Sequence, residues 1–272
     1  MIDIDNVSVA LGGRSILEAI GFTARPGQVT AVIGPNGSGK STLMKALCRD
    51  YAFDGQIRIN GQDITKLSSA TAATMRAVLP QSSSLPFPFT VREVVALGLT
   101  AGRPGVPMTA LRRLPDEALA RVDLSGFGGR FYGELSGGEQ QRVQLARVIC
   151  QVWLPVLDGV PRYLFLDEPV SSLDIKHQLL IMDVARRFAL SGGGVIAILH
   201  DLNLAAMYAD QVLAIRAGRV AGLGSPAQVL TDRLITQVFD CTMRVGAVPA
   251  AHIPFVLPQS ADSAALSPAK VA

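Results

Sequence analysis

The residues best suited to chemistry form one glycine-rich run, Gly34-Pro35-Asn36-Gly37-Ser38-Gly39-Lys40-Ser41-Thr42. An apolar segment, Gln28–Ile33, predicts a buried strand before the run, and Thr42–Ala46 continues into a predicted helix. This spacing is typical of a phosphate-binding loop, in which glycines allow backbone N–H groups to point at an anion at a helix N-terminus. Lys40 would reach the terminal phosphates of a nucleotide, and Ser41 would bind Mg²⁺. A chance glycine turn is the alternative, and both flanking elements argue against it.

Two carboxylates follow a second apolar run, Tyr163–Leu166, which predicts another buried strand. Asp167 and Glu168 would stand at the carboxyl end of that strand, where α/β sheets bind their ligands. Asp167 could hold Mg²⁺, and Glu168 could deprotonate a water that attacks a terminal phosphate. An acidic pair that merely ends a strand before Pro169 is the alternative, and the phosphate loop favours the functional interpretation.

A third segment reads Leu135-Ser136-Gly137-Gly138-Glu139. Ser136 and Glu139 have the spacing of a capping box, in which each side chain accepts a hydrogen bond from the other residue's backbone. An ordinary capped helix is the alternative, but the two glycines would leave N–H groups open to a phosphate. The chain thus has two candidate phosphate-binding helix starts, more than one simple nucleotide site needs.

Alternating strands and helices predict an α/β fold with a mainly parallel sheet. Val195–Leu199 is a further apolar strand candidate, and the long helix predicted over Asp174–Leu190 ends before three glycines. Ile57, Ile59 and the Asn60-Gly61 pair predict a strand entering a tight turn. From Thr90 to about Pro155 the patterns are helical, with capping signals at Thr90 and at Pro115-Asp116-Glu117.

Composition excludes several classes of protein. The 272 residues carry a net charge of only +3 without dense basic runs, so we expect no nucleic-acid partner. Although 49% of residues are apolar, no uncharged apolar stretch is long enough to span a bilayer, and the acidic start is unlike an export signal. We interpret the three widely spaced cysteines, Cys48, Cys150 and Cys241, as small buried apolar residues.

Together these motifs resemble the nucleotide-binding subunits of ABC transporters, over residues 2 to about 258. In that family the glycine run is Walker A, Tyr163–Glu168 is Walker B and Leu135–Glu139 is the signature. Matching positions give Gln81 of the Q-loop, Ser171-Ser172-Leu173-Asp174 of the D-loop and His200 of the switch. Each of these last three is weak alone, and their order along the chain gives them weight.

The resemblance implies a P-loop NTPase with N-terminal antiparallel strands and a helical subdomain. The core would span about 1–88 and 156–258, the subdomain about 89–155, and residues 259–272 would form a disordered tail. Glu168, His200 and Gln81 would be catalytic, and Ser41, Gln81 and Asp167 would hold Mg²⁺. ATP would contact residues 34–42 of one copy and Ser136, Gly137 and Gly138 of another, in a head-to-tail homodimer with Asp174 connecting the two sites.

Segment 79–95 resembles importers of metal chelates, namely ferric siderophores, cobalamin and heme. Segments 152–162, 200–206 and 239–258 resemble the ATPases of hemin importers within that group. This implies a peripheral ATPase on the cytoplasmic face of a bacterial inner membrane, with a permease dimer and, indirectly, a periplasmic heme-binding protein as partners. A siderophore or cobalamin importer is the first alternative. A soluble ABC ATPase and a nucleotide-gated module without turnover are others.

Three residues depart from this pattern or stay outside it. Leu11 occupies the place where the family usually stacks an aromatic ring on adenine, so we expect GTP to compete with ATP better than in the family at large. His177, on a predicted exposed helix, and His252, in the tail, are interpreted as solvated side chains rather than ligands.

Overall fold

The computed structural model describes residues 1–81, 87–102, 105–171, 173–250 and 252–261. Its larger sheet has the strand order β12-β11-β3-β10-β9-β6, and all neighbours except β12 and β11 pair in parallel. The strands are β3 (Val29–Ile33), β6 (Arg76–Leu79), β9 (Tyr163–Asp167), β10 (Gly194–Ile198), β11 (Gln211–Arg216) and β12 (Arg219–Gly224). The predicted α/β fold with a mainly parallel sheet is confirmed.

The central strands are apolar throughout because both faces of the large sheet are covered. Along β10, Val195 and Ala197 face one hydrophobic cluster while Ile196 and Ile198 face another. Parallel order also places the carboxyl ends of β3, β10, β9 and β6 at one edge. The segments that leave these ends carry the glycine run, His200, Glu168 and Gln81.

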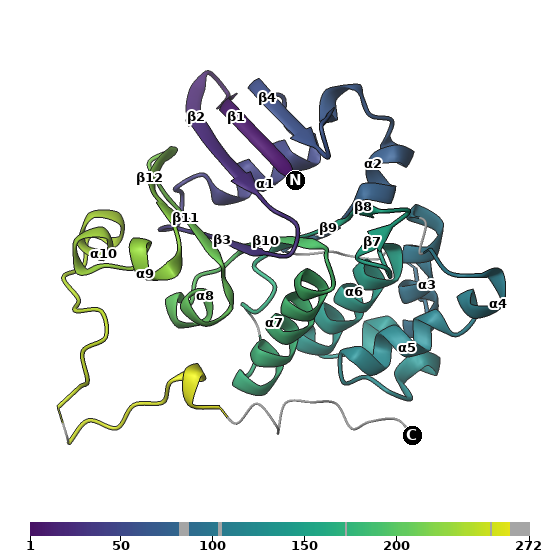
Figure 1. Cartoon of the computed structure of the whole chain (residues 1–272). Helices are drawn as coiled ribbons and strands as arrows, with labels where there is room; N and C mark the ends of the chain where they lie inside the picture. Colours follow the sequence, from purple (N-terminus) through teal and green to yellow (C-terminus); the bar gives the residue numbers. More distant parts are fainter. Residues whose placement is uncertain (82–86, 103–104, 172, 251, 262–272) are drawn as a thin grey trace.

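A second, antiparallel sheet covers one face of the large sheet (Figure 1). It has the order β2-β1-β4-β5 and comprises β1 (Ile2–Leu11), β2 (Arg14–Ala24), β4 (Asp54–Ile59) and β5 (Gln62–Asp63). Asn60 and Gly61 join β4 to β5 with φ of 51° and 78°, the pattern of the predicted tight turn. Between the two sheets lies α1 (Lys40–Cys48), whose Leu43 and Leu47 pack in the same cluster as Ile57.

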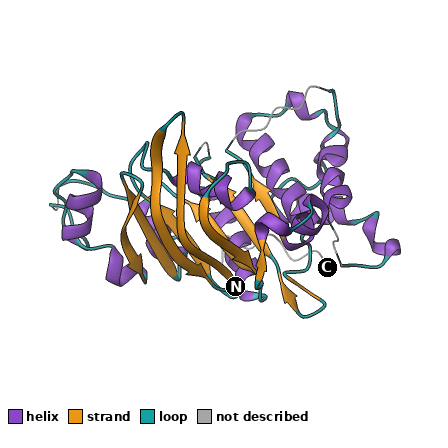
Figure 2. Cartoon of the chain, turned by 90° about the horizontal axis from the view of Figure 1, so that it is seen from above, coloured by secondary structure: helices purple, strands orange, loops and turns teal. Residues whose placement is uncertain are grey.

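Helices cover the opposite face of the large sheet and extend to one side of it (Figure 2). Capping boxes begin three of the described helices: those of Thr90 before α3 and Ser136 before α6 were predicted, and that of Ser225 before α9 was not. We call residues 91–151 the helical segment. The helices on this face and side are α3 (Val91–Ala101), α4 (Met108–Leu111), α5 (Leu114–Arg121), α6 (Gly137–Gln151), α7 (Ile175–Leu190), α8 (Leu202–Tyr208), α9 (Pro226–Val229) and α10 (Asp232–Phe239). A further helix, α2 (Ser69–Met75), packs its Met75 in the cluster between the two sheets.

The sequence analysis predicted neither β11 and β12 nor the strands between α6 and β9. The segment between α6 and β9 forms a hairpin of β7 (Val156–Leu157) and β8 (Val160–Pro161). Its turn residues, Asp158 and Gly159, have φ of 52° and 75°, again the pattern favoured by two-residue hairpins. An Asp-Gly pair is a strong hairpin signal, so the sequence did contain the information.

Two further predictions concern the cysteines and the tail. Cys150 is buried as expected, whereas Cys48 is half-buried and Cys241 is exposed, so the interpretation of all three as buried residues was wrong. Gln259 lies in a short 3₁₀ turn, and its side-chain Nε2 donates a hydrogen bond to the Asn203 carbonyl oxygen. Most of the tail, 262–272, lies outside the described residues. Among the described residues, no helix is long and apolar enough to cross a membrane.

Candidate functional site

The glycine run connects β3 to α1, and two of its glycines are required by close approach. A Cβ on Gly34, whose φ is +150°, would lie 2.2 Å from the Ile215 carbonyl oxygen. A Cβ on Gly39, at φ +106°, would lie 2.5 Å from Leu17 Cδ2. Gly39 is also the N-cap of α1 and offers no capping side chain, so the first N–H groups of α1 have no side-chain acceptor. An anion can take that place.

Lys40 begins α1 and is almost completely buried, with 5% of its surface exposed. Its Nζ donates hydrogen bonds to the carbonyl oxygens of Gly34 and Pro35, at 2.8 and 2.9 Å. Burial lowers the pKa of Lys40, and the nearby Glu168 and Asp167 carboxylates oppose that shift. The ammonium is thus held inside the loop, where phosphate oxygens could replace the two carbonyl oxygens.

Asp167 is the last residue of β9, and one of its carboxylate oxygens has no hydrogen-bond partner. Burial, and then the neighbouring Glu168 carboxylate, raise the pKa of Asp167. Its Oδ1 is buried and has no hydrogen-bond partner, and the same is true of Ser38 Oγ. A buried carboxylate oxygen without a donor is costly unless a cation completes its surroundings. With the half-buried Ser41 at the start of α1, it forms an oxygen donor set of the kind that suits Mg²⁺.

Glu168 lies at the centre of the site, and both of its carboxylate oxygens are engaged. His200 Nε2 lies 2.8 Å from Oε1, and Gln81 Nε2 donates a 2.8 Å hydrogen bond to Oε2. The Glu168 backbone has φ of 52°, and its carbonyl oxygen accepts a hydrogen bond from Gln141 on α6. Three segments far apart in sequence therefore converge on one carboxylate at the sheet edge.

These side chains line one cavity of about 650 Å³. Most of the predicted nucleotide-binding and catalytic residues meet there, and Asp167 lies beside it. The lining residues are Ile16, Asn36, Gly37, Gly39, Lys40, Ser41, Thr42, Gln81, Glu168 and His200. Ile16 was missed by the sequence reasoning. It lines the cavity, whereas Leu11 is half-buried and packs against the cluster between the two sheets.

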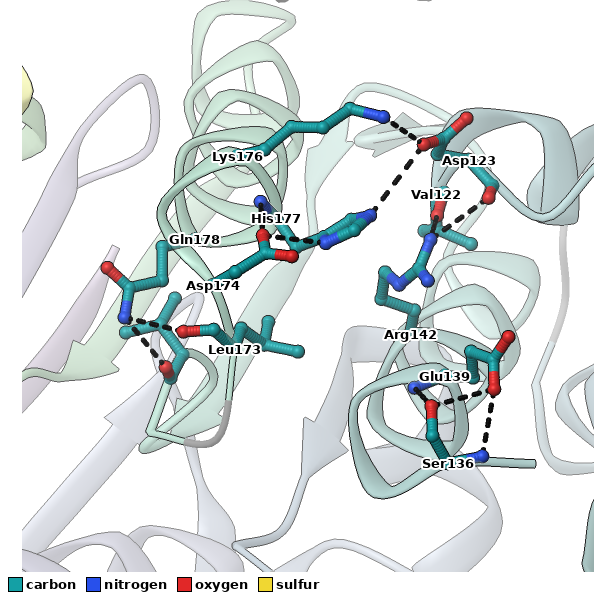
Figure 3. Close-up of polar contacts among 11 residues, drawn as sticks. Val122, Asp123, Ser136, Glu139, Arg142, Leu173, Asp174, Lys176, His177 and Gln178 are labelled. Atoms are coloured by element: carbon teal, nitrogen blue, oxygen red, sulfur yellow. Dashed lines mark hydrogen bonds and ion pairs between the residues drawn. The ribbon is translucent and has the colours of Figure 1, made fainter.

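The second predicted phosphate site lies elsewhere on the chain. Ser136, Gly137 and Gly138 do not belong to the lining of this cavity among the described residues. Ser136 is exposed and closes its own capping box, with Oγ donating to Glu139 Oε2 at 2.7 Å and the Glu139 backbone N–H donating to Ser136 Oγ at 3.3 Å (Figure 3). The hydrogen bonds that the Glu139 carboxylate accepts from the Ser136 hydroxyl and the Ser136 backbone N–H lower the pKa of Glu139. A Cβ on Gly137 would meet open space.

Comparison with known proteins decides the family. The family model described as ABC transporter matches residues 17–171. The chain belongs to the ABC transporter family. It is therefore an ATP-binding cassette, and the recognition made from its motifs is confirmed.

Relatives and solved structures agree with this family. The chain is 62% identical over 260 residues to the hemin import ATP-binding protein HmuV of Mesorhizobium japonicum, covering 96% of this cassette and 99% of that protein. It is 56% identical to the protein of the same name from Rhizobium meliloti, with the same coverage. A solved ATP-binding subunit of an ABC transporter superposes with a TM-score of 0.73 at 25% identity, covering 91% of this chain and 95% of that one.

Two histidine interpretations can now be judged for this cassette. His252 is exposed, as expected. His177 is not a solvated side chain: only 19% of it is exposed, and its ring lies between the carboxylates of Asp174 and Asp123. The expectation failed because Asp123 is distant in sequence and contributes no local signal.

Proposed function

We propose that this cassette is the ATP-hydrolysing subunit of an importer that moves hemin across a bacterial inner membrane. It would act at the cytoplasmic face with a permease dimer and, indirectly, a periplasmic heme-binding protein. The observation that carries the ATPase is Glu168, held between His200 and Gln81 beside the glycine loop. Hemin as cargo is supported by relatives 53–62% identical over at least 94% of the chain, all named hemin import ATP-binding proteins.

The glycine loop would bind the phosphates of ATP. Residues 34–42 place the uncapped start of α1 toward the cavity. Lys40 would exchange its contacts with Gly34 and Pro35 for phosphate oxygens, a stronger pairing because both partners are charged. The cavity wall at Ile16 offers an apolar surface to the base.

Mg²⁺ fits the orphaned oxygen of Asp167, and Ser41 and Gln81 would complete its protein ligands. When bound, it would neutralise charge on the β- and γ-phosphates. Asp167 itself would remain ionised beside the loop and act as an oxygen ligand rather than as a proton acceptor. This separates its role from that of Glu168.

Glu168 would be the general base. A water attacks the γ-phosphorus, its proton passes to the Glu168 carboxylate, and the bond from γ-phosphorus to the bridging oxygen breaks so that ADP leaves with the electron pair. Gln81 and His200 each contact one carboxylate oxygen, and the remaining lone pair of Oε2 would accept the hydrogen bond of the attacking water. His200 remains on Oε1 and orients the carboxylate.

A second copy would complete each site. Ser136, Gly137 and Gly138 lie outside the cavity of their own chain, with the start of α6 exposed. In a head-to-tail homodimer they would contact the γ-phosphate bound by the partner. We also propose the division into a core of about 1–88 and 156–258 and a helical subdomain of about 89–155, since the helical segment carries this signature.

Reconstitution tests the cargo. The cassette is co-purified with a candidate permease in nanodiscs, and phosphate release is measured with hemin, ferric siderophore and cobalamin, each presented on its binding protein. The proposal predicts stimulation by hemin alone and loss of stimulation in Glu168→Gln. Stimulation by ferric siderophore or cobalamin instead of hemin would contradict hemin as the cargo. An absence of hydrolysis in every assembly would contradict the proposed ATPase activity.

A further inference from the structure

One polar network joins the start of α7 to the helical segment, and Asp123 lies at its centre (Figure 3). Asp123 follows α5 and adopts φ of 59°. Its Oδ2 accepts a 2.7 Å hydrogen bond from Lys176 Nζ and lies 3.7 Å from His177 Nε2. The contact with Lys176 lowers the pKa of Asp123, so the carboxylate is ionised at neutral pH.

On the α7 side, His177 connects this carboxylate to the end of the D-loop. His177 Nδ1 lies 2.8 Å from Asp174 Oδ1, and the same oxygen accepts the His177 backbone N–H as the N-cap of α7. The imidazole therefore lies between carboxylates from two parts of the fold, at hydrogen-bond distance from Asp174 and 3.7 Å from Asp123. Asp174 is itself two-thirds exposed.

On the other side, the backbone beside Asp123 is bound to the signature helix. Arg142 Nη1 donates to the carbonyl oxygens of Val122 and Asp123, at 3.0 and 2.9 Å. Arg142 is only 7% exposed and lies one helical turn after Glu139, which closes the cap on Ser136. The path from Ser136 to Asp174 therefore consists of the first turns of α6, up to Arg142, and the polar contacts of Arg142, Asp123 and His177.

We infer that Asp123 is a positioning residue that fixes the orientation of the signature helix α6 relative to the start of α7. Resting on the proposed function, this means that Ser136 and Asp174 of one copy are presented together to the nucleotide of the other. Lys176 and Asp123 are both about half or more exposed, and such ion pairs contribute little to stability. The role of the link is thus geometric, and its removal should leave the chain folded.

The first test is steady-state hydrolysis by Asp123→Asn. Asparagine keeps the size and tolerates positive φ but removes the charge. We expect kcat to fall by about 3- to 30-fold, the range typical of coupling residues, while KM for MgATP stays unchanged. Asp116→Asn is the matched control, because Asp116 is an exposed aspartate paired with Arg92 inside the helical segment. Equal kcat in the two variants would overturn the inference.

A double-mutant cycle tests whether the named contacts act together. Lys176→Met combined with His177→Gln removes the α7 side of the network. If both sides act through one link, adding Asp123→Asn to this pair lowers kcat no further. Effects that multiply would show independent roles and contradict the network.

A distance measurement separates this inference from the proposed function. Spin labels are placed on cysteines at Met108 and Leu190, which are 80% and 67% exposed, in a background that carries Cys48→Ala and Cys241→Ser. Without nucleotide, Asp123→Asn should broaden the distance distribution between the labels, whereas Asp116→Asn should match the unsubstituted protein. An unchanged distribution in Asp123→Asn would overturn the inference even if the chain hydrolysed no ATP.

Discussion

The starts of α1 and α6 are the two candidate phosphate sites, and they differ in burial and in N-terminal capping. The start of α1 faces a cavity, has no side-chain cap, and places a buried lysine beside it. The start of α6 is exposed and capped by its own Ser136 and Glu139. We propose that the first binds an anion within a single chain, whereas the second meets the phosphate that is bound by a second copy. In this account the start of α1 binds the nucleotide, and the start of α6 completes the site of a second copy.

The largest effect should come from Glu168→Gln, which removes the base but keeps the shape of the α1 site. We expect kcat to fall by about 10²- to 10⁴-fold with ATP binding retained. Single-turnover phosphate release and equilibrium ATP binding measure the two properties. Glu117→Gln, on α5, is the control, and a Glu168→Gln protein with normal turnover would require another base.

The next largest effect should come from Lys40→Ala, which removes a contact needed for ATP binding. Loss of a buried charge-assisted contact should weaken ATP binding by about 10- to 150-fold. Isothermal titration gives the affinity, with the distant lysine variant Lys66→Ala as control. If Lys40→Ala bound ATP normally, the cavity beside α1 would not be the nucleotide site.

Ser136→Ala should have a smaller effect and one of a different kind. It should lower kcat by about tenfold, the loss of one strong hydrogen bond to phosphate, and leave ATP binding by the isolated chain unchanged. Thr90→Ala is the matched control because Thr90 closes the same type of capping box at α3. Equal losses of activity in both variants would mean that Ser136 acts only as a cap.

The smallest effect concerns stability at the α1 site. Because burial raises the pKa of Asp167, its ionised form destabilises the fold, and this cost appears as pH rises through the folded-state pKa. In metal-free buffer at neutral pH, Asp167→Asn should raise Tm by a few degrees. The gain should disappear at acidic pH, where Asp167 is protonated. A lower Tm at neutral pH would contradict this account.

Local patterns allowed the fold and most of the candidate site to be predicted. The glycine run, the two capping boxes and Asn60-Gly61 each act within a few residues, so short windows of sequence specify them. The convergence at the sheet edge followed from parallel strand order. The helix predicted over Asp174–Leu190 was also confirmed as α7, and the structure adds that Asp174 is its N-cap.

Contacts between distant segments could not be predicted in this way. Gln81 and Glu168 are 87 positions apart, and Lys176 and Asp123 are 53 apart. Neither pair has a local periodicity or spacing that indicates the contact. His177 was misjudged for this reason, and Ile16 was missed because an isolated isoleucine on an edge strand resembles any other apolar strand residue.

Specific activity measured against protein concentration tests the central claim most directly, because each site is proposed to need a second copy. Phosphate release would be followed across a dilution series, with sedimentation velocity in saturating MgATP reporting the fraction of dimer. We predict that activity per chain falls with the dimer fraction and vanishes for the monomer. Full activity per chain in a strictly monomeric sample would contradict the account.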